Sequence, residues 1–282
     1  MYTRDRFSGE HIVRPGLKLI GGKSKTRDIF YQLRPLNARS YIEPFLGSGA
    51  VWVGLPRYEF EVVSDVNEAA INFFQMMCAY PEILWKEISL LVEFVRMGGG
   101  DAWKYVRDNE PPDSVPRAAW FYVVTKYAMN GIFRRNKAGR CNSSWCKTVE
   151  GRGIYTREWF DIVVKRIQDA LILNLDYREC LKTYPDEDSW VFLDPPYRKC
   201  LTTYNGISFS DQDHEELEAM LYRASYRWLL TINDDEWVRG LYRGYNMIPH
   251  EIFYSCSQTP AGRSARPELI ILNYDAETGK RT

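Results

Sequence analysis

The sequence predicts an α/β fold in which a mostly parallel β-sheet is covered by helices on both faces. Short apolar segments expected to be strands, at residues 40–44, 59–63, 171–175, 190–193, 228–232 and 269–274, alternate with stretches of helical periodicity. Several of these segments end directly in a polar or glycine-rich turn, as parallel strands do before a helix. With 282 residues, 45% of them hydrophobic, the chain can bury a sizeable core.

Composition excludes several classes of protein. There is no apolar run of about 18 residues and no signal-peptide pattern, so we expect a cytoplasmic protein without membrane contact. Lys plus Arg and Asp plus Glu each number 37, so any site for a polyanion must come from local charge segregation. The six cysteines show no paired spacing and lie far from the three histidines, so we expect reduced thiols and no metal. We also expect a monomer in solution.

Residues 189–197 carry the most unusual chemistry of the chain. A buried strand at 190–193 must end at Asp194, because the two prolines that follow lack N–H groups. Asp194 and the carbonyl of Pro195 can therefore point acceptors outward, and Tyr197 offers a flat face beside them. Such a site suits a planar group that carries an NH2. The alternative is an ordinary turn with a solvated aspartate.

A glycine-rich turn, Glu43-Pro44-Phe45-Leu46-Gly47-Ser48-Gly49, follows the strand expected at 40–44. Such a turn lets a ligand lie against the backbone at the carboxyl end of the strand. Asp65 comes 18 residues after Gly47, at the end of the next strand, where an acid can hold ribose hydroxyls. The third position after Gly49 is Trp52 instead of glycine, so we expect a nucleoside-type ligand without an essential pyrophosphate. Asp65 is also a candidate N-cap for the helix expected from residue 68.

Two shorter segments are further candidates. Leu17 to Lys23 is an apolar piece that runs into two glycines and a lysine, which allows close backbone approach beside one cation. Taken alone, such a segment is more often an ordinary turn than a ligand site. Asp176-Tyr177 follows the strand expected at 171–175, and an acid with an aromatic there suits a purine. A helix cap beside a core tyrosine is the alternative.

The segment 126–152 is strongly basic in a chain of zero net charge. It holds seven lysines and arginines against one acid, Glu150, which gives +6 locally. Asn136 to Gly139 is a turn signal, so we expect a β-hairpin with basic residues at its tip. With interleaved aromatic and Asn side chains, this suits a nucleic-acid surface, although a solvated hairpin is the alternative. Upstream, Gly98-Gly99-Gly100 is the clearest break in the chain.

Together these residues resemble the Dam-type (D12 class, α-group) DNA adenine-N6 methyltransferases. Leu17 to Lys23 resembles the F-x-K-W-x-G-G-K element of that family, Glu43 to Gly49 its E-P-F-x-G-x-G element, and Asp194 to Tyr197 its D-P-P-Y element. Asn130 to Arg134 is similar to the N-G-L-x-R entry of the family's hairpin, and 269–274 to its last strand. The matches occur in the family's order and span nearly the whole chain.

The resemblance implies a Rossmann-like S-adenosylmethionine-dependent methyltransferase sheet with an inserted, mainly helical DNA-recognition domain that carries a β-hairpin. The catalytic domain would comprise residues 1–97 and 160–282, and the inserted domain residues 98–159. The implied cofactor residues are Leu19, Gly21, Lys23, Glu43, Phe45, Gly47, Gly49, Asp65 on the ribose, and Asp176 and Tyr177 around the adenine. The implied residues for double-stranded DNA are Asn130, Phe133, Arg134, Arg135, Lys137 and Arg140.

The implied catalytic residues are Asp194, Pro195, Pro196 and Tyr197. The target adenine would be flipped out of the duplex. Asp194 and the Pro195 carbonyl would accept its N6 hydrogens while Tyr197 stacks on the ring, which aims the nitrogen lone pair at the methyl group for direct displacement. No Cys, His or metal is needed.

Two alternative functions remain open from the sequence. The first is methylation of another planar amino group, namely cytosine N4, RNA adenine or a protein amide. The second, of a different class, is a catalytically silent DNA-binding protein, which predicts DNA affinity without turnover.

Overall fold

The computed structural model describes residues 16–19, 21–24, 26–147, 154–198, 209–253 and 265–281. The chain divides into two compact units, which are treated separately below. The first comprises Met1–Arg27, Gly47–Arg57 and Asn67–Asn174, and the second Asp28–Leu46, Tyr58–Val66 and Leu175–Thr282. No described helix is long and apolar enough to cross a membrane.

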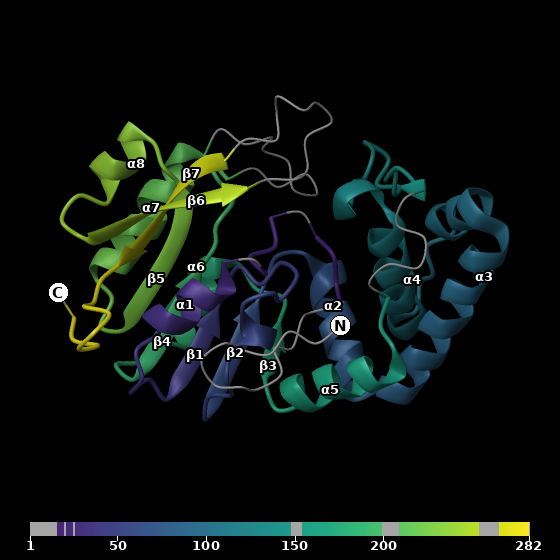
Figure 1. Ribbon diagram of the computed structural model, residues 1–282, viewed down its shortest axis with the longest axis horizontal. Coiled ribbons are helices and arrows are strands. Elements are labelled where there is room, and N and C mark those ends of the chain that lie inside the picture. Colours follow the sequence, from purple (N-terminus) through teal and green to yellow (C-terminus); the bar gives the residue numbers. More distant parts are fainter. Residues whose placement is uncertain are drawn as a thin grey trace. The chain divides into compact units, whose positions relative to one another are not determined.

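The second unit is built on strands of one sheet (Figure 1). Its strands are β1 (Ser40–Glu43), β2 (Phe60–Ser64), β4 (Ser189–Leu193), β5 (Arg227–Asn233), β6 (Asn246–Phe253) and β7 (Ala265–Leu272). Within the unit their order is β2-β1-β4-β5-β7-β6. The pairs of β1 with β2 and β4, and of β4 with β5, are parallel, whereas β7 is antiparallel to β5 and β6. The prediction of a mostly parallel sheet is therefore confirmed.

Helices cover both faces of this sheet. The unit holds α1 (Arg27–Leu33), α6 (Tyr177–Thr183), α7 (Asp211–Tyr222) and α8 (Glu236–Leu241). Phe192 of β4 packs on Phe30 of α1, with ring centroids 4.9 Å apart. Val191, the neighbour of Phe192 in β4, points its side chain to the opposite face of the sheet. Trp228 of β5 is level with Val191 and so lies on that face, where its Nε1 donates to the carbonyl of Leu221 in α7. Helices α1 and α7 thus lie on opposite faces of the sheet.

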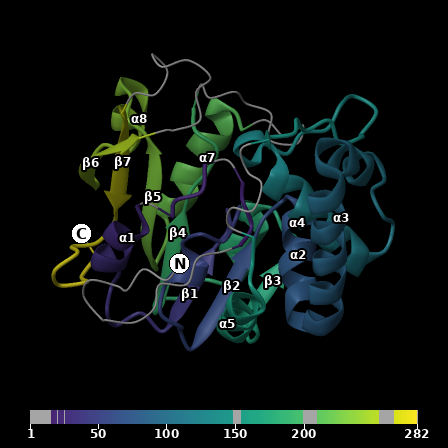
Figure 2. The same cartoon turned by 45° about the vertical axis from the view of Figure 1, so that its right-hand side comes forward.

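The buried strands explain why their apolar runs are continuous. Every residue of β1 and β4 is buried, which is typical of parallel strands covered on both faces. Figure 2 shows these central strands side by side with β5 and β7. The sequence did not indicate α8 or β6, and it offered the start of α6 at Asp176-Tyr177 only as an alternative. It placed the end of the strand at 171–175 two residues beyond its observed end, Leu173. The sequence also predicts a polar, basic loop at 255–266. Most of it lies outside the described residues, and β7 already begins at Ala265.

The first unit is mainly helical. It contains α2 (Glu68–Ala79), α3 (Pro81–Asp108), α4 (Ser114–Tyr127), α5 (Arg157–Ile167), β3 (Leu171–Leu173) and two short 3-10 helices, η1 (Trp52–Gly54) and η2 (Met129–Gly131). Helix α4 is its centre, since every residue from Ala118 to Tyr127 is buried. Tyr122 of α4 stacks between Phe73 of α2 and Tyr155, at centroid distances of 5.6 and 5.4 Å. Aromatic packing therefore joins α2, α4 and the segment before α5.

The break predicted at Gly98–Gly100 is a kink inside one helix. Helix α3 runs from Pro81 to Asp108, and Gly99 alone has a non-helical backbone there (φ 58°, ψ −138°). Apolar positions recur at helical spacing from residue 69 to about 97, which predicts helix over this stretch. The structure divides it at Tyr80, because Pro81 begins a new helix. A side chain at Gly100 would meet the indole of Trp145 at 3.3 Å. A Cβ at Gly100 would therefore be closer than an ordinary van der Waals contact. The predicted break is observed as the non-helical Gly99 between two helical stretches.

The segment expected to form a hairpin folds back on itself through isolated bridges. Ala128 bridges Trp145 and Arg135 bridges Cys141, both antiparallel. At the tip, the N–H of Asn136 donates to the carbonyl of Arg140 over 2.9 Å. Among the described residues of 128–145 no regular strand is assigned, so a hairpin domain for DNA recognition stays a proposal, as do the domain bounds.

Candidate active site

Polar residues gather at the carboxyl ends of the parallel strands of the second unit. Glu43 ends β1, Asp65 follows β2, Asp194 follows β4 and Asn233 ends β5. The chain runs from β1 to β2 on one side, whereas β4 and β5 lie on the other side of β1. Such a reversal of strand order opens a crevice at the carboxyl ends, where α/β sheets bind ligands. The sequence had predicted these positions as strand ends.

The Asp194 carboxylate is held by the neighbouring strand. Thr231 of β5 is buried, and its Oγ1 donates to Oδ1 of Asp194 over 2.8 Å. The register that pairs Leu193 with Leu230 places the two residues level, so the contact follows directly from strand pairing. Pro195 is buried, and Tyr197 is half-buried. The turn after β4 therefore begins from a fixed carboxylate.

A buried glutamate and an aromatic stack lie at the end of β1. Glu43 is only 2% exposed and accepts a hydrogen bond of 2.7 Å from the hydroxyl of Tyr41. Burial raises the pKa of Tyr41, and the adjacent Glu43 charge adds to this effect. Two residues on, Phe45 stacks on Tyr177 with ring centroids 5.2 Å apart and an interplanar angle of 27°. The structure thus brings two predicted ligand residues, Phe45 and Tyr177, into contact.

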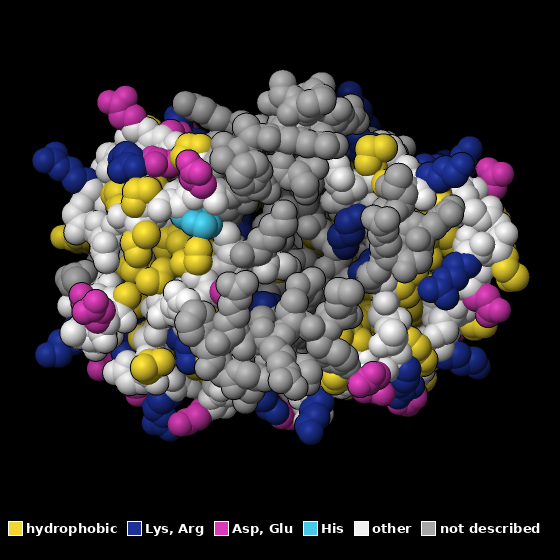
Figure 3. Space-filling view, in the orientation of Figure 1, with side chains coloured by type: hydrophobic (Ala, Val, Ile, Leu, Met, Phe, Trp, Pro, Cys, Tyr) yellow, Lys and Arg dark blue, Asp and Glu magenta, His cyan; other side chains and the backbone are white. Residues whose placement is uncertain are grey.

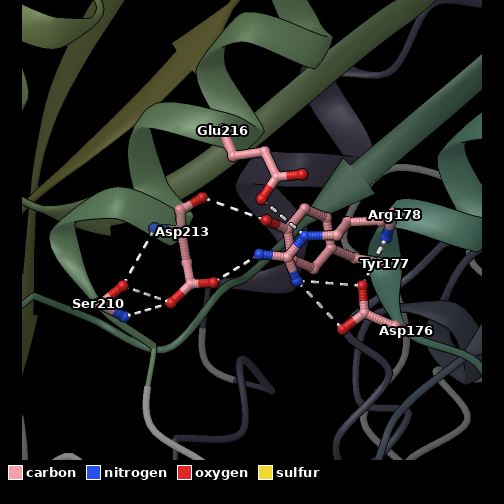
Figure 4. A network of polar contacts seen from close by, with 6 residues as sticks. All are labelled: Asp176, Tyr177, Arg178, Ser210, Asp213 and Glu216. Carbon is pink, nitrogen blue, oxygen red and sulfur yellow. Dashed lines mark hydrogen bonds and ion pairs between the residues drawn. The ribbon is translucent and has the colours of Figure 1, made fainter.

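Asp176 and Tyr177 open helix α6. Asp176 is its N-cap, since its Oδ1 accepts from the N–H of Arg178 over 2.9 Å. Tyr177 is buried and donates from its hydroxyl to the carbonyl of Asp213 over 3.2 Å (Figure 4). Burial also raises its pKa above the ordinary value for tyrosine. The helix cap and core tyrosine, left open by the sequence, are therefore observed.

Arg178 joins three carboxylates around this cap (Figure 4). Its guanidinium contacts Asp176 at 3.3 Å, Asp213 at 2.5 Å and Glu216 at 2.8 Å. Burial alone would lower its pKa, but the hydrogen bonds to Glu216 and Asp213 raise it overall. Asp213 closes a capping box with Ser210 at the start of α7. This network fixes the first turn of α7 against the first turn of α6, and the sequence gave no local signal for it.

His214 of α7 is a buried histidine that sequence patterns did not single out. Its side chain is 0% exposed, and its ring lies edge-on to Phe209 at 4.6 Å. Neither ring nitrogen has a hydrogen-bond partner among the described residues. Burial lowers its pKa below the ordinary value. A protonated His214 is therefore costly in the folded protein.

The first unit holds Lys23 and the last three residues of the glycine-rich turn, Gly47 to Gly49. Gly47 and Gly49 have positive φ angles of 51° and 68°, which explains why glycine stands at both positions. A side chain at Gly22 would meet Oγ of Ser48 at 3.1 Å, so the segment before α1 lies directly against this turn. Lys23 is 5% exposed and its Nζ donates to the carbonyl of Gly21 over 3.4 Å.

Two other predicted cofactor positions are Leu19 and Asp65. Leu19 is half-buried, and Asp65 is partly exposed after β2. The N-cap of α2 is Asn67, whose side chain accepts from the N–H of Ala70. Asp65 as the N-cap of this helix is therefore wrong, because the N-cap lies two residues later, at Asn67. Its role toward a ribose stays a prediction.

Predicted DNA-binding residues differ in what they contact. Arg135 binds Glu110 with both Nη atoms, at 2.6 and 2.7 Å. The ring of Phe133 is edge-on to Phe121 at 5.0 Å, and Arg135 lies over it at 5.2 Å. Asn130 is half-buried with a positive φ of 56°. These three residues are thus engaged within the unit.

Basic residues nearer the tip are exposed. Arg134, Lys137 and Arg140 are all exposed, and Arg134 donates to Oγ of Ser144 over 3.2 Å. Lys126, which contributes to the basic count, is instead buried and donates to the carbonyl of Gly16 over 2.8 Å. Burial, with a small effect of Lys18, lowers its pKa to about 8. Figure 3 shows further Lys and Arg side chains in the region where Figure 1 places α3 and α4.

In the described part of the chain, no group of three or more His, Cys, Asp or Glu residues could hold a metal ion. The four cysteines described there are free thiols. Burial raises the pKa of Cys78 to about 12 and that of Cys180 to about 11, which keeps both thiols protonated near neutral pH.

Comparisons with known proteins agree with this geometry. Residues 19–256 match the family model of the D12 class N6 adenine-specific DNA methyltransferases. The type II methyltransferase M.CviBI of Paramecium bursaria Chlorella virus NC1A is 29% identical over 271 residues, which cover 93% of this chain and 100% of that protein. The type II methyltransferase M.MjaIII of Methanocaldococcus jannaschii is 28% identical over 93% of this chain and 99% of its own. A DNA adenine methylase of Vibrio cholerae is 27% identical over 92% of this chain and 95% of its own length.

The burial of His214 predicts a pH-dependent stability. An unfolded histidine takes up a proton near pH 6.5, whereas buried His214 resists it. Stability should therefore be full above about pH 6.5 and fall below it, by at most about 1.4 kcal/mol per pH unit. His214→Phe keeps a ring of similar shape and should flatten this decline in thermal melts between pH 7.5 and 5.5. The same decrease of melting temperature between pH 7.5 and 5.5 in wild type, His214→Phe and the control His250→Phe would show that His214 does not cause the pH dependence.

Proposed function

Because the chain belongs to the family of D12 class N6 adenine-specific DNA methyltransferases, we propose that it methylates N6 of adenine at a specific sequence in double-stranded DNA. The observation that carries the proposal is Asp194-Pro195-Pro196-Tyr197 at the carboxyl end of β4, where the strand order reverses. Members of such families generally take the methyl group from S-adenosylmethionine, and we assign this donor here.

The groups at the strand ends suit the nucleoside part of this donor. Asp65 can accept from ribose hydroxyls, and Asp176 stands beside the paired rings of Phe45 and Tyr177, which suits a purine. Buried Glu43 adds a fixed carboxylate. In the first unit, the positive-φ glycines 47 and 49 leave the backbone open to close approach, because a Cβ at Gly47 would meet nothing within 4 Å. We assign Leu19, Gly21 and Lys23 to the donor as well.

The residues after β4 would position the target. The sulfonium donor supplies an electrophilic methyl group when bound. Asp194 and the carbonyl of Pro195 accept the two N6 hydrogens of an extruded adenine, and Tyr197 stacks on its ring. Holding both hydrogens would draw the nitrogen lone pair out of conjugation and so make N6 nucleophilic toward the methyl group that the donor would supply. Asp194, which would hold one of these hydrogens, would accept the proton that N6 must release. Thr231 aims the carboxylate through its 2.8 Å hydrogen bond.

Residues 98–159 would form the inserted DNA-recognition domain. We assign phosphate contacts to Arg134, Lys137 and Arg140, because these three side chains are exposed. Arg135 is held by Glu110 and would position the segment, while Asn130 and Phe133 remain candidates for base contacts. The enzyme is proposed to act as a cytoplasmic monomer.

Removal of the Asp194 carboxylate should abolish catalysis without loss of the donor. Asp194→Ala should lower kcat by about 10²–10³-fold or more, while the Kd for S-adenosylmethionine, measured by calorimetry, stays within about tenfold. Thr231→Val removes only the hydrogen bond and should cost about tenfold in kcat. Asp188→Ala, at the exposed opposite end of β4, is the matched control. Turnover near the wild-type rate in Asp194→Ala would remove this carboxylate from the mechanism.

Loss of the exposed tip charges should reduce the salt dependence of DNA binding. The triple variant Arg134→Ala, Lys137→Ala and Arg140→Ala should lower the slope of log K against log salt by up to about 3, since each phosphate contact contributes about 0.9. Fluorescence anisotropy over a salt series measures this slope. The control triple variant Lys86→Ala, Arg96→Ala and Lys104→Ala removes equal charge from α3. An equal reduction of the salt slope by both triple variants would show that the three tip residues make no specific phosphate contacts with DNA.

A further inference from the structure

The residue that follows Tyr197 is tied to three other elements of the second unit. Arg198 is the last described residue of the turn after β4, and its side chain is only 14% exposed. We infer that Arg198 is a positioning residue, which fixes the exit of this turn and thereby orients Tyr197 toward the target base. The inference rests on the proposed function, since Tyr197 is assigned there to the adenine.

The contacts of Arg198 use the full planar group. Its Nε and Nη2 bind the two oxygens of Asp211 at 2.7 and 2.8 Å, which is a bidentate pair. Its Nη1 lies 3.4 Å from Oδ2 of Asp235. The guanidinium carbon is 4.5 Å from the ring centroid of Trp237, within the range of a cation–π contact. Together these contacts hold the side chain from three directions.

The partners of Arg198 are themselves fixed. Asp211 is the first residue of α7, whose cap is closed by Ser210 and Asp213. Asp235 is the N-cap of α8, where its Oδ1 accepts from the N–H of Val238 over 2.8 Å. Oδ2 of Asp235 also accepts from Nδ2 of Asn233, at the end of β5, over 3.2 Å. Arg198 thus joins the turn after β4 to the end of β5 and to the starts of α7 and α8.

The same contacts argue against a phosphate-binding role. Two carboxylates offset the single positive charge, and the hydrogen bond with Asp211 raises the pKa of Arg198 further. Arg239 provides a contrast, because among the described residues its one ion pair is with Asp234 and its side chain is 47% exposed. Arg198 is therefore used inside the fold.

Both ends of the catalytic turn are then restrained. Thr231 fixes its first residue, Asp194, and Arg198 fixes the residue after Tyr197. Because an aromatic ring can stack on a base only in a narrow range of orientations, freedom at this exit should misplace the ring. A lysine keeps the charge but provides neither the bidentate fork nor the planar face for Trp237.

The test compares Arg198→Lys, Arg198→Ala and Asp211→Asn with the control Arg239→Ala in the full-length protein. Steady-state methylation of unmethylated DNA gives kcat, calorimetry gives the Kd for S-adenosylmethionine, and thermal melts report folding. We expect kcat to fall about 10- to 100-fold in both Arg198 variants and less in Asp211→Asn. The donor Kd should stay within about threefold, and Arg239→Ala should behave as wild type.

Three outcomes would overturn the inference. A wild-type kcat in Arg198→Lys would show that charge alone suffices, and an equal loss in Arg239→Ala would show that any ion pair of this unit matters. A parallel loss of donor binding and melting temperature would show a general structural role. A wild-type protein that binds the donor but methylates no DNA would instead overturn the proposed function, and this is seen before any variant is compared.

Discussion

Parallel pairing of β4 with β1 and β5 is the constraint on which the candidate site depends. It sets Leu193 level with Leu230 and so brings the hydroxyl of Thr231 to the carboxylate of Asp194. The two prolines then end the strand, and acceptors are left at the edge of the sheet. A slip of one residue would turn every side chain of β4 to the opposite face, so the fully buried strands also secure the chemistry.

Arginines have two different uses in this chain. Arg178 and Arg198 are saturated by carboxylates and hold the starts of α6, α7 and α8 in place. Arg135 is likewise committed to Glu110. Exposed Arg134 and Arg140 lie near the tip of the basic segment and suit a polyanion. A count of positive charges along the sequence cannot distinguish these two uses, because it contains no information about partners distant in the chain.

The sequence anticipated the features that depend on local rules. The two prolines after Asp194 predict the end of the strand there. The glycines at 47 and 49 predict a turn, and both have positive φ angles in the structure. The break indicated at Gly98–Gly100 is observed as well, as the non-helical backbone of Gly99 inside α3. Buried His214 and the anchors of Arg198 could not be found, since their partners come from other elements.

The most direct test of the account is incubation of the purified protein with radiolabelled S-adenosylmethionine and unmethylated genomic DNA, followed by nucleoside analysis and mapping of modified bases. The account predicts that the label appears in N6-methyladenine within one short sequence motif. Label in N4-methylcytosine, in RNA or in protein would contradict it, as would donor binding without any label in DNA.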